Sequence, residues 1–240
     1  MTSSRPPTSD LGLRLRPGFQ RFSAVELLVA IVLLFVATPF VEDLPGGDLV
    51  ETILMSLVLV SAVLAIGGRR RLLVWAVVLV APAVIGKWLN HLRPELVPRP
   101  VFMVAALLFI VFVVVQLLRF VLRAPRVNSE VLCASIAVYL LLGLTWAFAY
   151  VLTAEARPTA FAFNVAPEAG QTMDSQSAFY YSFVTLSTVG YGDITPVSRI
   201  ARMLSVMESM TGSLYVAVLI ARLVSLYSAT PPPNSGDPEV

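Results

Sequence analysis

The stretch Thr185-Leu-Ser-Thr-Val-Gly-Tyr-Gly-Asp193 decides how this chain of 240 residues is interpreted. Gly190 and Gly192 lack a Cβ atom and can adopt positive φ without a steric penalty. Positive φ at these glycines breaks the ordinary strand pattern, in which successive carbonyl groups point to opposite sides. The carbonyl groups of residues 188–191 can then line one axis and replace the water shell of a cation. Such irregular backbone survives at membrane depth only where it is buried in protein or lines water.

The composition indicates a membrane protein. Hydrophobic residues make up 57% of the chain, charged residues 13%, and the mean hydropathy is +0.81. Soluble domains are typically about 45–50% apolar and about 25% charged. The formal charge of +2 is too small to suggest a nucleic-acid partner. His91 and Cys133 are the only histidine and cysteine, so the sequence offers no Cys/His metal site and no nucleophile–base pair. We therefore expect neither an enzyme nor a bound cofactor.

Six apolar segments are long enough to cross about 30 Å of hydrocarbon as helices, which takes about 20 residues each. They are Phe22–Phe40, Leu49–Ile66, Leu72–Leu89, Val101–Leu118, Val131–Leu152 and Arg199–Tyr227. Between the last two lies Ser175–Ser187, which is too short to cross and follows Asp174, a typical N-cap residue. The expected fold is an all-α membrane protein with six transmembrane helices, a re-entrant pore helix and a filter loop.

The distribution of basic residues predicts the topology. With the N-terminus inside, the inner segments hold eleven arginines, whereas the outer segments hold six basic residues, Lys87 among them. Both termini are therefore expected to be cytoplasmic, in a multi-pass protein of the cell membrane. The expected division is a cytoplasmic tail (1–21), a four-helix unit (22–126), a pore unit (127–228) and a disordered cytoplasmic tail (229–240). Within the pore unit, residues 175–187 form the pore helix and 188–193 the filter.

Residues 127–228 resemble the two-helix pore module of potassium channels, with outer helix, pore helix, filter and inner helix in the same order. The string of residues 188–193, TVGYGD, is similar to the filter of that family. The stretch Leu204–Leu223 looks like small prokaryotic channels of the family, whose six-helix plan the first four helices match only in number. The resemblance implies that K⁺ binds at the backbone carbonyls of Thr188, Val189, Gly190 and Tyr191. It also implies filter roles for Gly192 and Asp193, pore-helix support from Tyr180, Tyr181, Thr185 and Ser187, and an inner-helix hinge at Gly212.

Two positions depart from the family pattern. Many members have two tryptophans in the pore helix where this chain has Tyr180 and Tyr181. Some members also carry a pore-helix glutamate that braces the filter aspartate, and the equivalent position here is Val184. Asp193 therefore needs another partner, and the hydroxyl of Tyr180 or Tyr181 is the candidate.

Glu208 is an ionisable residue in the middle of the last apolar segment, which makes it a candidate functional residue for gating or filter support. It lies four residues before Gly212 and so shares a helix face with it. One interpretation buries Glu208 behind the filter, protonated or hydrogen-bonded to Thr185 or Ser182. The other interpretation has four copies of Glu208 ringing the cavity and concentrating cations.

The fourth apolar segment, Val101–Leu118, contains no charged residue, whereas voltage sensors need charges that move through the membrane field. Arg119, Arg123 and Arg126 follow it, either as a positive-inside anchor or as a vestigial sensor. The expected function is a potassium-selective channel subunit that conducts passively as a homotetramer in membrane lipid and is not voltage-gated. Alternatives are a weakly selective cation channel, a subunit that requires a partner, and a transporter with four filters, against which the single filter argues.

Overall fold

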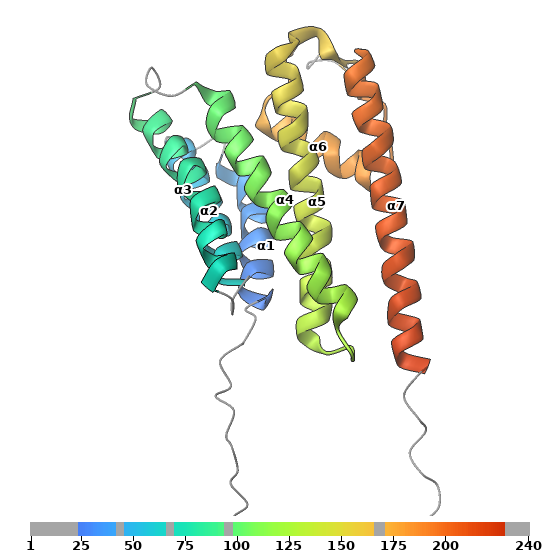
Figure 1. Cartoon of the computed structure of the whole chain (residues 1–240). Helices are drawn as coiled ribbons and strands as arrows, with labels where there is room; N and C mark the ends of the chain where they lie inside the picture. Colours follow the sequence, from blue (N-terminus) through green and yellow to red (C-terminus); the bar gives the residue numbers. More distant parts are fainter. Residues whose placement is uncertain (1–23, 42–45, 66–69, 94–97, 166–170, 229–240) are drawn as a thin grey trace, which may run out of the picture.

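The computed structural model describes residues 24–41, 46–65, 70–93, 98–165 and 171–228, which form seven α-helices and two short strands (Figure 1). The helices are α1 (Ala24–Val41), α2 (Gly47–Ala65), α3 (Arg70–Leu92), α4 (Arg99–Arg123), α5 (Ser129–Ala156), α6 (Ser175–Leu186) and α7 (Arg199–Ser228). Strand β1 (Phe161–Phe163) follows a single 3₁₀ turn, and β2 (Ile194–Pro196) precedes α7. The helices were expected, whereas the small sheet was not.

Four of the helices, α3, α4, α5 and α7, are long and apolar enough to cross a membrane, and α1 and α2 are shorter apolar helices. The chain is therefore a multi-pass membrane protein. The expected tails at 1–21 and 229–240, together with Phe22 and Ile66, lie outside the described residues.

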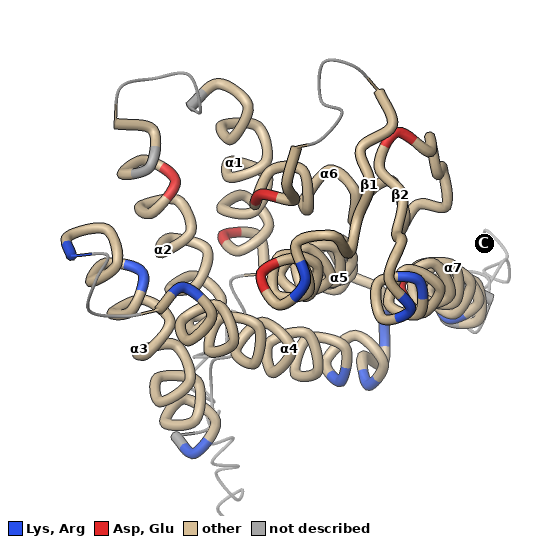
Figure 2. The backbone as a smooth tube through the Cα atoms, turned by 90° about the horizontal axis from the view of Figure 1, so that it is seen from above, with Lys and Arg blue, Asp and Glu red and all other residues tan. Residues whose placement is uncertain are grey.

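Helices α1 to α5 surround a common centre when the molecule is viewed from above (Figure 2). Helix α1 packs on α2 and α5, α2 on α3, α3 on α4, and α4 on α5. Buried apolar side chains from these helices, among them Ile31 of α1, Phe109 of α4 and Val138 of α5, form one continuous core. Helix α7 packs mainly on α5 and α6.

The count of basic residues placed Lys87 in an outer segment, but Lys87 lies inside α3. Its Nζ atom is 2.8 Å from Glu51 Oε1 of α2, and the two charges offset each other. Lys87 therefore carries little weight in the count of basic residues that predicts the topology.

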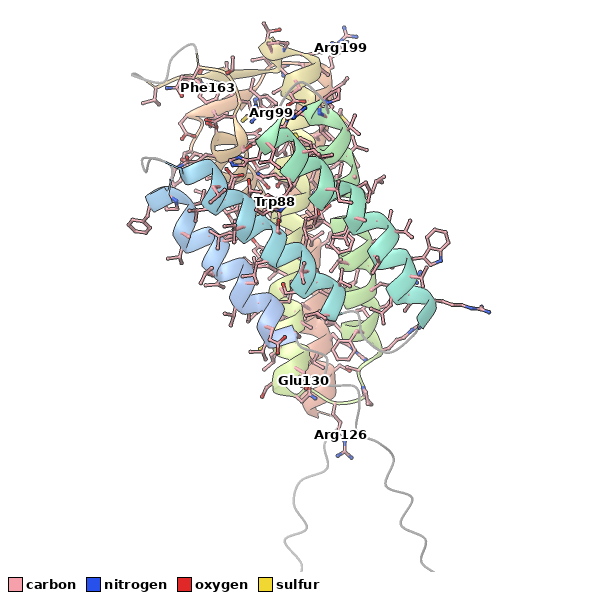
Figure 3. All side chains as sticks on the ribbon, turned by 90° about the vertical axis from the view of Figure 1, so that its left-hand side faces the viewer. Trp88, Arg99, Arg126, Glu130, Phe163 and Arg199 are labelled. Atoms are coloured by element: carbon pink, nitrogen blue, oxygen red, sulfur yellow. The ribbon has the colours of Figure 1, made fainter. Side chains whose placement is uncertain are left out.

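Figure 3 shows Arg99, Phe163 and Arg199 towards one end of the molecule and Arg126 and Glu130 towards the other. Strand β1, which precedes α6, therefore lies far from the connection between α4 and α5.

Helices α4 and α5 are joined by a short connection that also contacts α7. The side chain of Asn128 caps α5 by accepting a hydrogen bond from the backbone N–H of Val131 at 2.9 Å. Arg222 of α7 donates from its guanidinium group to the carbonyl oxygens of Leu122 (3.2 Å) and Ala124 (3.0 Å). The last turns of α4 and α7 are therefore tied together at the end of the molecule opposite the sheet.

Two glycines let α6 approach its neighbours closely. A Cβ atom built on Gly143 of α5 would lie 2.3 Å from Cζ of Phe183, so the glycine leaves the space that the phenyl ring fills. A Cβ atom on Gly212 of α7 would lie 2.1 Å from the carbonyl oxygen of Leu186, the last residue of α6. The close approach of α7 to α6 thus accounts for glycine at position 212 independently of any hinge.

We expect Gly143→Ala to lower the stability of the purified protein, because the added methyl group forces the Phe183 ring out of its place. Overpacking of this kind costs about 1–3 kcal/mol. Thermal unfolding in detergent measures the change. When Phe183 is replaced by the smaller Leu, adding Gly143→Ala should lower the unfolding midpoint less than it does in the wild type. An unchanged midpoint for Gly143→Ala alone would contradict the close packing.

Candidate functional site

Helix α6 begins and ends with residues suited to those places. Asp174 is its N-cap, and its Oδ1 atom accepts a hydrogen bond from the backbone N–H of Ser177 at 2.7 Å, as the sequence predicted. Ser187 is the C-cap, so the helix ends one residue earlier than expected. The Ser187 hydroxyl donates to the carbonyl oxygen of Phe183 at 2.6 Å and closes the last turn.

The first residues of the loop after α6 are hydrogen-bonded back to the end of that helix. The Val184 carbonyl oxygen accepts from the N–H groups of Val189 (3.0 Å) and Gly190 (3.3 Å), and the Thr188 N–H donates to the Thr185 carbonyl (2.9 Å). In a trans peptide, the N–H of one residue and the carbonyl of the preceding residue point in opposite directions. The carbonyl oxygens of Thr188 and Val189 therefore point away from α6.

Positive φ recurs at every second residue of this loop. The φ angles are 60° at Thr188, 59° at Gly190 and 79° at Gly192. The two glycines were expected to adopt this conformation, whereas Thr188 was not. A β-branched residue at positive φ is a genuine outlier that costs on the order of 1–3 kcal/mol, so its surroundings must hold it there. Gly190 and Gly192 are two residues apart, and the same spacing counted back from Gly190 reaches Thr188. This spacing is the sequence signal that could have predicted positive φ at Thr188.

Asp193 ends the loop and is held by the hydroxyl of Tyr180. The Tyr180 hydroxyl lies 2.6 Å from Oδ2 of Asp193, while Oδ1 accepts from the N–H of Ile194 at 3.0 Å. Of the two tyrosines considered from the sequence, Tyr180 is thus the partner. The hydroxyl of Tyr181 instead lies 2.7 Å from Oγ of Ser205 in α7.

Glu208 is fully buried between three helices. Its Oε2 atom accepts a hydrogen bond from the hydroxyl of Tyr150 in α5, and its Oε1 atom lies 2.5 Å from the Ser182 hydroxyl of α6. Ser182, one of the two partners considered from the sequence, is therefore in contact. A ring of carboxylates in an open cavity requires an exposed side chain, and the burial of Glu208 favours the position behind the loop. Sequence reasoning missed Tyr150, because nothing local links it to a residue in α7.

The hydrogen-bond count around Glu208 favours a protonated carboxyl group. Ser182 Oγ also lies 2.7 Å from the Gly143 carbonyl oxygen, so the network holds three short oxygen–oxygen contacts. Each contact needs one hydrogen, and the hydroxyls of Ser182 and Tyr150 supply two. A hydrogen on Glu208 supplies the third and avoids burying an uncompensated charge. With it, the network joins α5, α6 and α7 with every contact satisfied.

The part of the chain that contains this site matches a family of membrane transport proteins. Residues 131–229, which include α5 except its first two residues, α6, the loop and α7, match a family model described as "Ion channel". The match is with ion channels and not with an enzyme, in agreement with the sequence analysis.

Three curated relatives are potassium channels by name. The similar stretch is 39% identical over 62 residues to "Two pore potassium channel c" of Oryza sativa subsp. japonica, covering 26% of this chain and 14% of that protein. It is 46% identical over 48 residues to "Two-pore potassium channel 4" of Arabidopsis thaliana (20% and 17%). It is 41% identical over 51 residues to "Voltage-gated potassium channel Kch" of Escherichia coli strain K12 (21% and 12%). The chain thus spans less than a fifth of the length of these relatives.

We expect Glu208→Gln to leave thermal stability close to that of the wild type, since the amide can donate to Ser182 and accept from Tyr150 as a neutral acid does. Glu208→Val removes the donor and the acceptor and leaves the buried Tyr150 hydroxyl without its carboxyl partner, at a cost of about 1–3 kcal/mol. Thermal unfolding of the purified variants gives the comparison. If the glutamine variant is as unstable as the valine variant, Glu208 is not a neutral hydrogen-bonding acid.

Proposed function

We propose that the chain is one subunit of a potassium-selective channel in which four copies surround a single pore. The observation that carries the proposal is the backbone of residues 188–192, with positive φ at alternate residues and N–H groups turned back to α6. The matched family and the names of the relatives support it.

In this proposal, K⁺ sheds its water and is coordinated by the carbonyl oxygens of Thr188, Val189, Gly190 and Tyr191, with the Thr188 hydroxyl as the innermost oxygen. The carbonyls carry no net charge, so the ion is held without being trapped. The C-terminal end of α6 has the partial negative charge of a helix dipole and favours a cation near the inner end of the row. Tyr180, Tyr181 and Thr185 support this loop from α6, and Ser187 supports it from the C-cap position.

A ring of copies is needed because one chain supplies oxygens on one side of the ion only. Val189 and Tyr191 are 53% and 71% exposed in the single chain. Helix α7 carries exposed apolar side chains along its length, including Met203, Leu214 and Val224. Neighbouring copies around a closed four-fold axis would cover part of this surface and complete the coordination shell.

The proposed topology has six membrane crossings, with α6 re-entering from the outer side and both termini in the cytoplasm of a cell bounded by this membrane. The 18 and 19 residues of α1 and α2 fall in the range of about 17–25 that crosses a bilayer. The four-helix unit (22–126) then flanks the pore unit (127–228). In α4, Arg119 and Arg123 lie in the last turns, and the preceding span has no charge to act as a voltage sensor.

Gly190→Ala tests the filter. Alanine is penalised at positive φ, and in the single chain a Cβ atom at this position would meet no described atom within 4 Å, so we attribute the expected effect to the backbone. In liposomes loaded with K⁺, with Na⁺ as competitor, the wild type should pass K⁺ selectively, whereas the variant should lose K⁺ flux yet still insert and assemble. Selective flux at the wild-type level in Gly190→Ala would overturn the filter assignment. Native mass measurement of both proteins checks the tetramer.

Gating is expected to be nearly independent of voltage. A charge that crosses the membrane field contributes about 2.3 kcal/mol per 100 mV, and α4 offers none within its apolar span. Planar-bilayer currents should therefore change little in open probability between −100 and +100 mV, on the order of twofold. A steep rise over tens of millivolts that is flattened by Arg119→Gln/Arg123→Gln would show that these arginines form a sensor.

A further inference from the structure

Asn164, the residue directly after β1, contacts three residues at the outer end of the loop. Its side-chain Nδ2 donates to the carbonyl oxygen of Gly192 at 2.9 Å and to Oγ1 of Thr195 at 3.0 Å. Its backbone N–H donates to the carbonyl oxygen of Asp193 at 2.7 Å. Both hydrogens of the side-chain amide are thus engaged, one of them on the backbone of the proposed filter.

Strand β1, which precedes Asn164, is anchored in the protein. Strand β1 pairs antiparallel with β2, with Phe163 opposite Ile194. Phe161 is buried, and its ring packs edge-on against Tyr150 and Tyr181 with centroid distances of 5.5 Å. Tyr150 and Tyr181 belong to the layer behind the loop, so β1 and the loop share one support. Asn164 is therefore held at a fixed place relative to Gly192.

The Gly192 oxygen belongs to the Gly192–Asp193 peptide, and Asn164 Nδ2 is its hydrogen-bond donor. The φ angle of Gly192 is 79°, and a Cβ atom built there would meet no described atom within 4 Å, so side-chain packing does not fix the peptide. Rotation of this peptide would change where the Gly192 oxygen points and would disturb the neighbouring Tyr191. The hydrogen bond from Asn164 turns that oxygen towards β1.

We propose that Asn164 is a positioning residue that sets the outer limit of the row of ion-binding oxygens. By holding the Gly192 carbonyl towards β1, it ends the row at Tyr191 and resists rotation of the Gly192–Asp193 peptide, which borders that row. This role rests on the proposed function of residues 188–193 as a potassium filter. It assigns a selectivity role to a residue outside the filter and outside α6.

The chemistry of the amide gives a sharp substitution. Only the Nδ2 side of Asn164 can donate to the Gly192 oxygen, since the Oδ1 side would place two acceptors face to face. Asn164→Asp keeps the shape but puts a charged oxygen where the donor was. The matched control is Thr195→Val, which is similar in size and removes the other partner of the amide while it leaves the Gly192 bond in place.

The experiment compares the wild type, Asn164→Asp and Thr195→Val in planar bilayers. The potassium-to-sodium permeability ratio is taken from reversal potentials. The fall of the current with time during a recording is followed at low and high external K⁺. Loss of one hydrogen bond predicts a ratio up to about tenfold lower for Asn164→Asp, with Thr195→Val unchanged. High external K⁺ should slow the decay in Asn164→Asp, because ions that occupy the row hold its peptides in place.

A selective wild type with Asn164→Asp indistinguishable from Thr195→Val in ratio and decay overturns the positioning role alone. A wild type that does not select K⁺ overturns the proposed function, and the positioning role with it. Native mass measurement checks that each variant assembles. If Asn164→Asp does not assemble, Asn164→Ala removes the donor without adding an oxygen, and the same fall in selectivity is required of it.

Discussion

The arrangement of α5, α6 and α7 depends on the hydrogen bonds from the loop after α6 to the carbonyl oxygens of Thr185 and Val184. The last carbonyls of a helix have no partner within the helix, and the N–H groups of an irregular loop have none within the loop. Lipid offers neither of them a substitute for water. Here the two sets satisfy each other. In the proposed topology, α6 can therefore end within the membrane because this loop follows it, and the loop is stable there because α6 precedes it.

This mutual dependence makes the placement of α6 critical, and two helices fix it. Gly143 of α5 admits the Phe183 ring, and Gly212 of α7 admits the carbonyl of Leu186. The buried contacts of Glu208 with Ser182 and Tyr150 then join the same three helices through oxygen atoms alone. Close packing sets the distance between the helices, whereas the polar network sets the rotation of α6 about its axis. Thr188 keeps its positive φ only if its surroundings hold it there, so it depends on both the packing and the polar network.

Local signals in the sequence predicted the helices, the N-cap at Asp174 and the choice of a tyrosine hydroxyl for Asp193, because composition and short spacings determine these features. The contact of Glu208 with α6 was predicted in part, with Ser182 named and Tyr150 missed. Tyr150 lies 58 residues from Glu208 and Asn164 lies 28 from Gly192, and no periodicity within one element relates such distant positions. The small sheet was missed for the same reason, since its three-residue strands are too short to show alternation.

The connection between α4 and α5, residues 124–128, has a consequence for the order in which the protein forms. Five residues reach at most about 18 Å, so α4 is confined to the neighbourhood of the α5 that follows it in the same chain. The two helices pack as an antiparallel hairpin, a contact between segments adjacent in the sequence that forms early and at low entropic cost. Helices α4 and α5 can therefore pair while synthesis of the chain continues, before α6 and α7 have been made.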